Sequence, residues 1–102
     1  MIEFRNGRID FPSRKDFGPQ QDDQTQSFGR PVITFAVILT GYELRYDSSD
    51  HHFKIGTVNV EGSLVDPTTV NVTGTLGLRD KSDFDDSYSG FVAYAVVAET
   101  QP

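Results

Sequence analysis

Apolar and polar residues alternate along most of the chain after its first third, and this pattern predicts β-strands. The segment VITFAVIL, residues 32–39, is apolar at nearly every position, which predicts a strand buried on both faces. Gly41 marks a bend after it. In YELRYD, residues 42–47, the apolar side chains fall on the opposite face from Glu43 and Arg45.

Residues 51–65, HHFKIGTVNVEGSLV, also alternate, but the apolar positions change parity partway along. The change falls at Gly56-Thr57, where we expect a β-bulge or kink. The VDPTT that follows predicts a turn, because the fixed backbone angle of Pro67 suits its opening position.

Two segments in the last third of the chain alternate over ten residues or more. TVNVTGTLGLRD, residues 69–80, places four apolar side chains on one face, namely Val70, Val72, Leu76 and Leu78. YSGFVAYAVVAET, residues 88–100, is apolar on both faces. This last strand is therefore either central in a sandwich or buried at a subunit contact.

The first third of the chain is more polar. Asn6-Gly7 predicts a turn, followed by a short alternating segment. Residues 12–30 are rich in proline, glycine and glutamine and predict a long loop. Two aromatic residues in it, Phe17 and Phe28, either stack on a ligand or tuck against the sandwich, and we favour the second.

No segment shows helical periodicity or an internal repeat. Five or six antiparallel strands joined by polar turns predict an all-β fold, a β-sandwich with a single domain over residues 1–102. A length of 102 residues leaves no room for a second core.

Composition narrows the classes of function. The net charge of −6 disfavours nucleic-acid binding, which needs a surplus of basic residues. No apolar run is long enough to cross a membrane, and no hydrophobic signal core opens the chain. The sequence therefore leaves the localisation undetermined. An extracellular or virion-associated protein with this sequence would need a non-classical export route. The absence of cysteine excludes disulfides and thiolate metal sites.

Two polar stretches are candidate metal sites. His51 and His52 are the only histidines, and adjacent residues of a strand point to opposite faces, so one chain does not offer both to one ion. A three-fold axis would change this by bringing together one histidine from each subunit. Residues 80–88, DKSDFDDSY, hold four carboxylates but lack the spacing of a calcium loop. We favour a polar turn and an acidic loop, and predict no metal and no cofactor.

Catalytic motifs are also missing. The chain has no nucleophile elbow, no Cys–His pair and no glycine-rich phosphate loop, so we expect no enzyme activity.

The order of features resembles the H-type lectin domain, the module of snail agglutinins and of the discoidin carboxyl terminus. The segments that carry the resemblance are NGRIDF, PVITFAVILTGYEL, HHFKI, VNVTGTLGLRD and FVAYAVVAE. The resemblance implies a six-stranded antiparallel β-sandwich and a homotrimer with a parallel axis. It also implies sites for galactose or N-acetylgalactosamine in the grooves between subunits.

The resemblance also suggests site residues. An acidic residue of the first long loop corresponds to Asp22 or Asp23, and a basic residue of a later strand to Lys54. Where the family has an aromatic residue and a histidine, this chain has Leu78, Arg79 and Asp80. Arg79 would then donate paired hydrogen bonds to hydroxyl groups, and Tyr88 would supply a ring from the facing strand.

Two functions follow as expectations. One is a lectin, a non-catalytic carbohydrate-binding module that acts multivalently as a trimer. The alternative is a structural or adhesion subunit of a phage tail, baseplate or surface appendage that binds no sugar.

Overall fold

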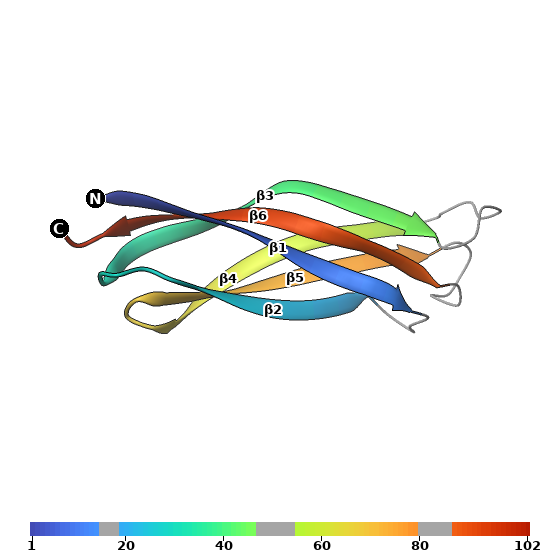
Figure 1. Ribbon diagram of the computed structural model, residues 1–102, viewed down its shortest axis with the longest axis horizontal. Coiled ribbons are helices and arrows are strands. Elements are labelled where there is room, and N and C mark those ends of the chain that lie inside the picture. The colour runs from blue at the N-terminus through green and yellow to red at the C-terminus, as the bar shows by residue number, and fades with distance from the viewer. Residues whose placement is uncertain (15–18, 47–54, 80–86) are drawn as a thin grey trace.

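The predicted all-β sandwich is confirmed. The computed structural model describes residues 1–14, 19–46, 55–79 and 87–102. For three residues at strand ends, Arg14, Ile55 and Arg79, it describes the backbone alone. It contains six antiparallel strands in two three-stranded sheets (Figure 1). The strands are β1 (Ile2–Arg14), β2 (Gln20–Ser27), β3 (Val32–Tyr46), β4 (Ile55–Asp66), β5 (Thr69–Arg79) and β6 (Tyr88–Thr100).

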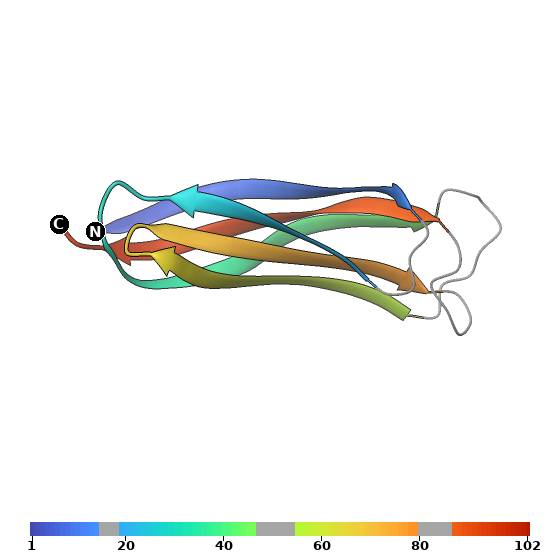
Figure 2. The same cartoon turned by 90° about the horizontal axis from the view of Figure 1, so that it is seen from below.

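The sheets stack face to face and form an elongated body of 53 × 20 × 18 Å. Sheet A has the strand order β1-β6-β3, and sheet B has the order β2-β5-β4. Figures 1 and 2 show that both chain termini lie at one end of this body, which we call the terminal end. We call the other end, where β1, β3, β5 finish and β6 begins, the distal end. No helix in the described part of the chain is long and apolar enough to cross a membrane.

The two middle strands supply most of the core. In β5 the predicted alternation is confirmed, since Val70, Val72 and Leu76 are fully buried and Leu78 nearly so. The doubly apolar β6 is the central strand of sheet A, as one of the two sequence alternatives required. Its inward side chains are buried, with Val92, Val96 and Ala98 at 0% exposure, whereas the other face of β6 points away from sheet B.

The predicted turn at Asn6-Gly7 is wrong, because both residues lie in the middle of β1. Gly7 pairs with Tyr94, whose buried ring occupies the space a side chain would need. The Tyr94 hydroxyl donates to Gln24 Oε1 at 2.7 Å and accepts from Gln26 Nε2 at 2.8 Å. Position 7 is therefore glycine because the Tyr94 ring fills the space of a side chain, and not because the chain turns there. Through its hydroxyl, Tyr94 also links sheet A to β2.

The predicted long loop over residues 12–30 is also wrong. It contains the end of β1 and all of β2. Strand β2 pairs with β5 at every position from Gln20 to Ser27, and most of its side chains are exposed. The side chains of a polar edge strand can stay in water at little cost in stability. Its composition therefore resembles that of a loop, and composition alone does not predict the strand. Phe28 is buried as favoured, and Phe17 lies outside the described residues.

Strand β3 and the bulges differ from expectation as well. Strand β3 is an edge strand of sheet A, and Ile33 and Ile38 are 57% and 49% exposed, so it is not buried on both faces. Gly56 and Thr57 pair regularly with β5, so the bulge expected there is absent. Register shifts occur instead at Ile33 and Thr40 in β3, at Val65 in β4, and between Phe11 and Arg14 in β1.

The predicted turn between β4 and β5 is confirmed. The Asp66 carboxylate accepts hydrogen bonds from the backbone N–H and the hydroxyl of Thr68, at 2.9 and 3.1 Å. The backbone hydrogen bond is the main reason that the pKa of Asp66 lies below its usual value.

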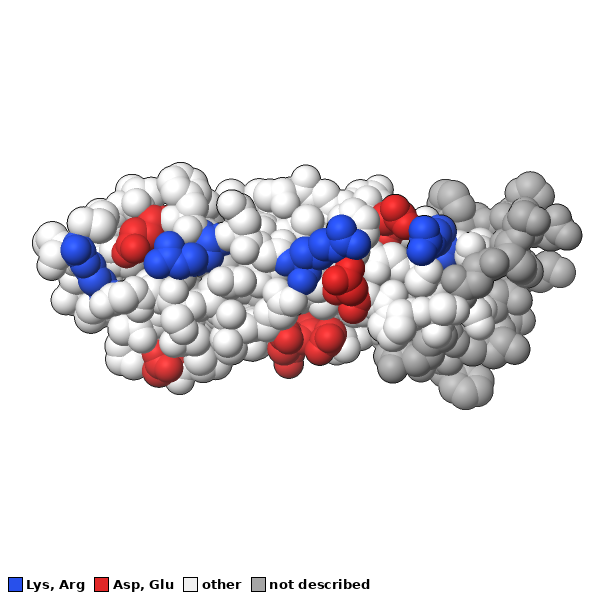
Figure 3. Space-filling view, in the orientation of Figure 1, with Lys and Arg blue, Asp and Glu red and all other residues white. Residues whose placement is uncertain are grey.

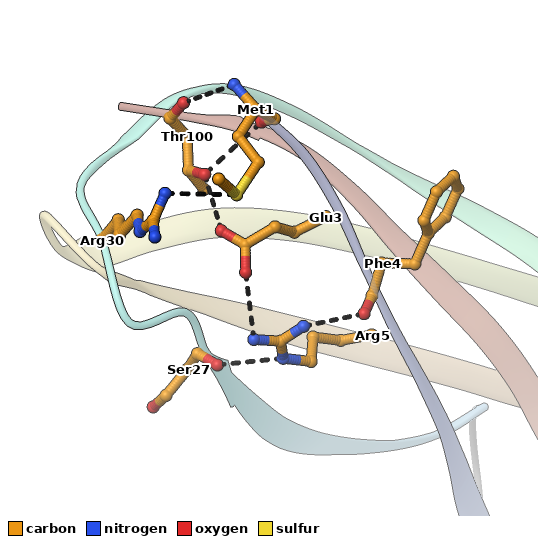
Figure 4. Close-up of polar contacts among 7 residues, drawn as sticks. All are labelled: Met1, Glu3, Phe4, Arg5, Ser27, Arg30 and Thr100. Atoms are coloured by element: carbon orange, nitrogen blue, oxygen red, sulfur yellow. Dashed lines mark hydrogen bonds and ion pairs between the residues drawn. The ribbon is translucent and has the colours of Figure 1, made fainter. Parts of the chain in front are cut away.

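A polar cluster joins both termini at the terminal end. The amino-terminal ammonium group of Met1 donates to the Thr100 carbonyl at 2.9 Å, and Thr100 N–H donates back to Met1. Figure 4 shows Glu3 between Thr100, whose hydroxyl donates to it at 2.6 Å, and Arg5. The Thr100 hydrogen bond is the main cause that lowers the pKa of Glu3. Arg5 also donates to the Ser27 carbonyl, so the cluster ties sheet A to the end of β2.

Candidate binding site

The predicted acidic residues lie on a strand rather than in a loop. Asp22 and Asp23 are exposed in β2, opposite Gly74 and Thr73 of β5. The Asp23 carboxylate accepts from the Thr73 hydroxyl at 2.7 Å, and the Asp22 carboxylate accepts from the Asp23 N–H at 2.9 Å. Both carboxylates are therefore exposed to water, and each already accepts a hydrogen bond from a nearby group.

Within one chain these aspartates lie far from the backbone of Arg79. The backbone of Arg79 ends β5 beside Ile55, five to six residues beyond Thr73 and Gly74. At about 3.3 Å per residue, this is a separation of roughly 17–20 Å. The side chain of Arg79 lies outside the described part, as do Lys54, Asp80, His51 and His52. Among the described residues, no group of three His, Cys, Asp or Glu is placed to hold a metal ion.

Tyr88 does not present its ring to a ligand. It has 0% exposure, and its hydroxyl donates to the Leu76 carbonyl of sheet B at 3.3 Å. Its large apolar ring fills the space between the sheets, where alternation along β6 places it beside the other inward side chains. A stacking role for Tyr88 would therefore require this ring to leave its buried position.

A different group of polar residues comes together on the outer face of sheet A, the face turned away from sheet B. Ile9 and Phe11 of β1 point into the core, so Arg8 and Asp10 point outward. On β3, the extra residue at Thr40 reverses the parity of the strand. After it, Glu43 pairs with the outward Phe91. The bulge thus turns the charged positions of β3 outward.

These residues line an open hollow of about 460 Å³, which we call the outer depression. Asp10 of β1 and Glu43 of β3 both pair with Phe91 of the central strand β6, so the two carboxylates lie on either side of Phe91. The Cα atoms of Asp10 and Glu43 are about 10 Å apart. The residues that line the hollow are Arg8, Asp10, Phe11, Pro12, Ser13, Glu43, Arg45, Ser89, Gly90 and Phe91.

Ion pairs organise the outer depression. Arg8 Nε lies 2.7 Å from Asp10 Oδ1, and its guanidinium lies 3.8 Å from the centre of the Phe91 ring. Across the hollow, Arg45 Nη1 lies 2.8 Å from Glu43 Oε1. All four charged side chains are about half exposed or more. Exposed pairs of this kind contribute only about 0–1 kcal/mol, so a ligand can exchange partners with them at small cost.

A second hollow of about 420 Å³ lies on the other side of β3, between the sheets. Tyr42, Leu44 and Tyr46 line it together with Arg45, which borders both hollows. Tyr42 is 58% exposed, whereas Tyr88 and Tyr94 are buried. An accessible aromatic ring therefore lies on β3 next to Glu43, on the opposite side of that strand from the outer depression.

Charges on the described surface are mixed in sign. Figure 3, drawn from the side of Figure 1, shows basic groups spaced along the long axis with acidic groups beside most of them. No protein-family model, curated protein or solved structure matches the chain.

Proposed function

We propose that the chain is a non-catalytic carbohydrate-binding module of the galactose or N-acetylgalactosamine type that acts multivalently as a homotrimer. The observation that carries the proposal is the outer depression, in which two arginine–carboxylate pairs flank Phe91. Sugar hydroxyls both donate and accept hydrogen bonds, and this hollow offers acceptors and forked donors side by side.

The open shape of the hollow is in keeping with weak binding by one copy. A shallow site makes few contacts, so useful affinity depends on several sites acting together. Three sites on one rigid body would gain avidity of about 10² to 10⁴ when the target sugars are suitably spaced.

The residues suggested by the lectin resemblance fit a site built from two subunits. Asp22 and Asp23 lie far along β5 from Arg79, so a sugar that contacts both regions would need a neighbouring copy. The six-stranded antiparallel sandwich that the resemblance implies is present, but many functions share this architecture. The sugar site thus has two candidate locations, the outer depression and a groove between subunits, and point mutations distinguish them.

The test is a glycan array followed by calorimetric titration with galactose and N-acetylgalactosamine. Loss of binding in Arg8→Ala and Glu43→Ala, with retention in Asp23→Ala, assigns the site to the outer depression. Loss in Asp23→Ala or Arg79→Ala instead assigns it to the subunit groove. Glu61→Ala, at an exposed carboxylate of β4, is the control and should bind normally. No binding across a broad array would refute the lectin proposal.

The second candidate is a structural or adhesion subunit of a phage tail, baseplate or surface appendage. The observation that favours it is a set of large apolar side chains exposed on sheet A, with Ile2 at 58%, Phe4 at 61% and Ile38 at 49%. A stable oligomer that binds no glycan would support this function.

A further inference from the structure

The outer depression already holds a positive charge against an aromatic ring. The guanidinium of Arg8 lies over the Phe91 ring, 3.8 Å from its centre, and Arg8 Nε lies 2.7 Å from Asp10 Oδ1. A ring face and a carboxylate that converge on one positive charge form a binding site for a cation. The side chain that occupies this site belongs to the chain itself.

Glu43 adds a second carboxylate beside the same ring. It pairs with Phe91 from β3, as Asp10 does from β1. Glu43 contacts Arg45 through Oε1 at 2.8 Å, and Asp10 contacts Arg8 through Oδ1. An ionised carboxylate can accept about four hydrogen bonds, so both carboxylates keep acceptor positions for a ligand.

The two arginines differ in how they are held. Arg45 Nε donates to the Ser89 hydroxyl at 3.3 Å, in addition to the ion pair with Glu43. The Arg8 side chain is held by the ring and by an ion pair in which Arg8 is 57% and Asp10 69% exposed. Exposed pairs of this kind contribute little to stability, and the long stem of arginine lets its charge reach water. A ligand can therefore take the place of the Arg8 guanidinium at small cost.

A cationic ligand suits this site better than an anionic or a neutral one. An anion would have to separate an arginine from its carboxylate and would then lie beside Asp10 or Glu43, where like charges repel. A neutral group in the place of Arg8 would leave Asp10 and the ring without the positive charge that they now contact. An ammonium group restores both contacts, and the net charge of −6 adds a weak attraction.

We propose that the outer depression prefers a protonated amino sugar, such as galactosamine, to neutral galactose and N-acetylgalactosamine. The ammonium group on the second ring carbon replaces the Arg8 guanidinium over Phe91, and the hydroxyl groups face Glu43 and Arg45. The hollow of about 460 Å³ lies in the usual range of ligand sites, about 300–1,000 Å³. This inference rests on the proposed function, because it names the galactose-type sugar that the same site takes.

The first test is an NMR titration of the chain with three sugars that differ only at the second ring carbon. Galactose carries a hydroxyl group there, N-acetylgalactosamine a neutral acetamido group, and galactosamine an amine that is protonated at about pH 6. At this pH galactosamine should bind at least about 3-fold more tightly than the other two. This is the ratio expected from one exposed ion pair together with one cation–π contact.

Two variants locate the preference. Asp10→Asn and Glu43→Gln keep the shape of each side chain and remove its charge, so the ratio of galactosamine to galactose affinity should fall towards one. Glu61→Gln, at an exposed carboxylate of β4 in sheet B, is the matched control and should keep the ratio. All three changes alter the net charge of −6 equally, so a difference between them reports a local effect. Circular dichroism checks that each variant is folded.

Arg8→Gln removes the positive charge that competes for the ring. Galactosamine should then bind about 2-fold more tightly than it binds the unchanged chain, because the Phe91 ring and Asp10 are free. Galactose should not gain, because it loses a hydrogen-bond donor and brings no charge. Opposite responses of the two sugars to one substitution distinguish competition at the ring from a general loss of structure.

The outcomes separate the inference from the proposed function. Equal binding of the three sugars would overturn the inference and leave the proposed function standing. The same holds for a preference for galactosamine that persists in Asp10→Asn and Glu43→Gln, or that falls equally in Glu61→Gln. If none of the three sugars binds, the proposed function fails, and the inference fails with it.

Discussion

Replacement of Gly7 by alanine tests how the two sheets are held together. A Cβ atom at this position would lie 2.3 Å from both Cζ and Oη of Tyr94. Unbonded carbon atoms need about 3.5 Å, so the ring must move by more than about 1 Å. Its hydrogen bonds to Gln24 and Gln26 measure 2.7 and 2.8 Å, so we expect a movement of this size to break or weaken both.

The expected loss of stability is about 3–5 kcal/mol. Overpacking of a filled core costs about 1–3 kcal/mol, and each lost hydrogen bond about 1 kcal/mol. A domain of this size has a free energy of unfolding of about 5–15 kcal/mol, so the change would remove a large part of it. The melting temperature should fall by at least about 12 °C.

Urea unfolding followed by circular dichroism measures the change, with Gly41→Ala as control. Gly41 lies in β3 of the same sheet, and no atom lies within 4 Å of the Cβ position there. In a background of Tyr94→Leu, which removes the clashing end of the ring, the cost of Gly7→Ala should approach that of Gly41→Ala. Equal stability of Gly7→Ala and Gly41→Ala in the wild-type background would refute the reasoning.

Three further predictions concern the backbone, the turn and pH. Gly90→Ala should destabilise the chain at least as much as Gly7→Ala in urea titrations, because its Cβ would lie 1.9 Å from the Glu43 carbonyl oxygen, which cannot swing away. Asp66→Ala should lower the melting temperature modestly, whereas Asp66→Asn should retain most of it, since an amide oxygen still accepts from the turn. The pKa of Glu3 is lowered on folding, so its stabilising contribution is present above the unfolded-state pKa and is lost as pH falls from about 4.5 through the lowered pKa. Glu3→Gln should therefore flatten the decrease in stability over this acidic range, and an unchanged slope would contradict the assigned hydrogen bond.

Alternation predicted the strands that face the core and missed a strand that does not. Val70 and Val72 in β5 are read correctly because burial imposes a period of two on the sequence. The polar β2 has no such period; it is a strand because β5 offers it backbone partners. Gly7 was read as a turn signal, because the ring that occupies its side-chain space lies 87 residues away in the sequence.

The outer depression could not be predicted because its residues meet only through β6. Nothing in the sequence links Arg8 and Asp10 with Glu43 and Arg45 until both outer strands pair with the same central strand. Their outward direction on β3 also depends on the extra residue at Thr40, and the sequence suggested a bulge elsewhere. Tyr88 was given a ring for the ligand by the lectin resemblance, and its burial was not predicted because parity gives two faces of β6 without saying which is the inner one.

The position of β6 has a consequence for the order in which the molecule can form. Strands β1 and β3 have no partner in sheet A other than β6, and β6 is the last strand in the chain. During synthesis, β2, β5 and β4 can already pair to form sheet B, while the backbone groups of β1 and β3 still lack their partner strand. Sheet A therefore cannot form before β6 is made, and a nascent chain stalled before Tyr88 would expose the unpaired edges of β1 and β3, including the apolar run of β3, to chaperones or to other copies.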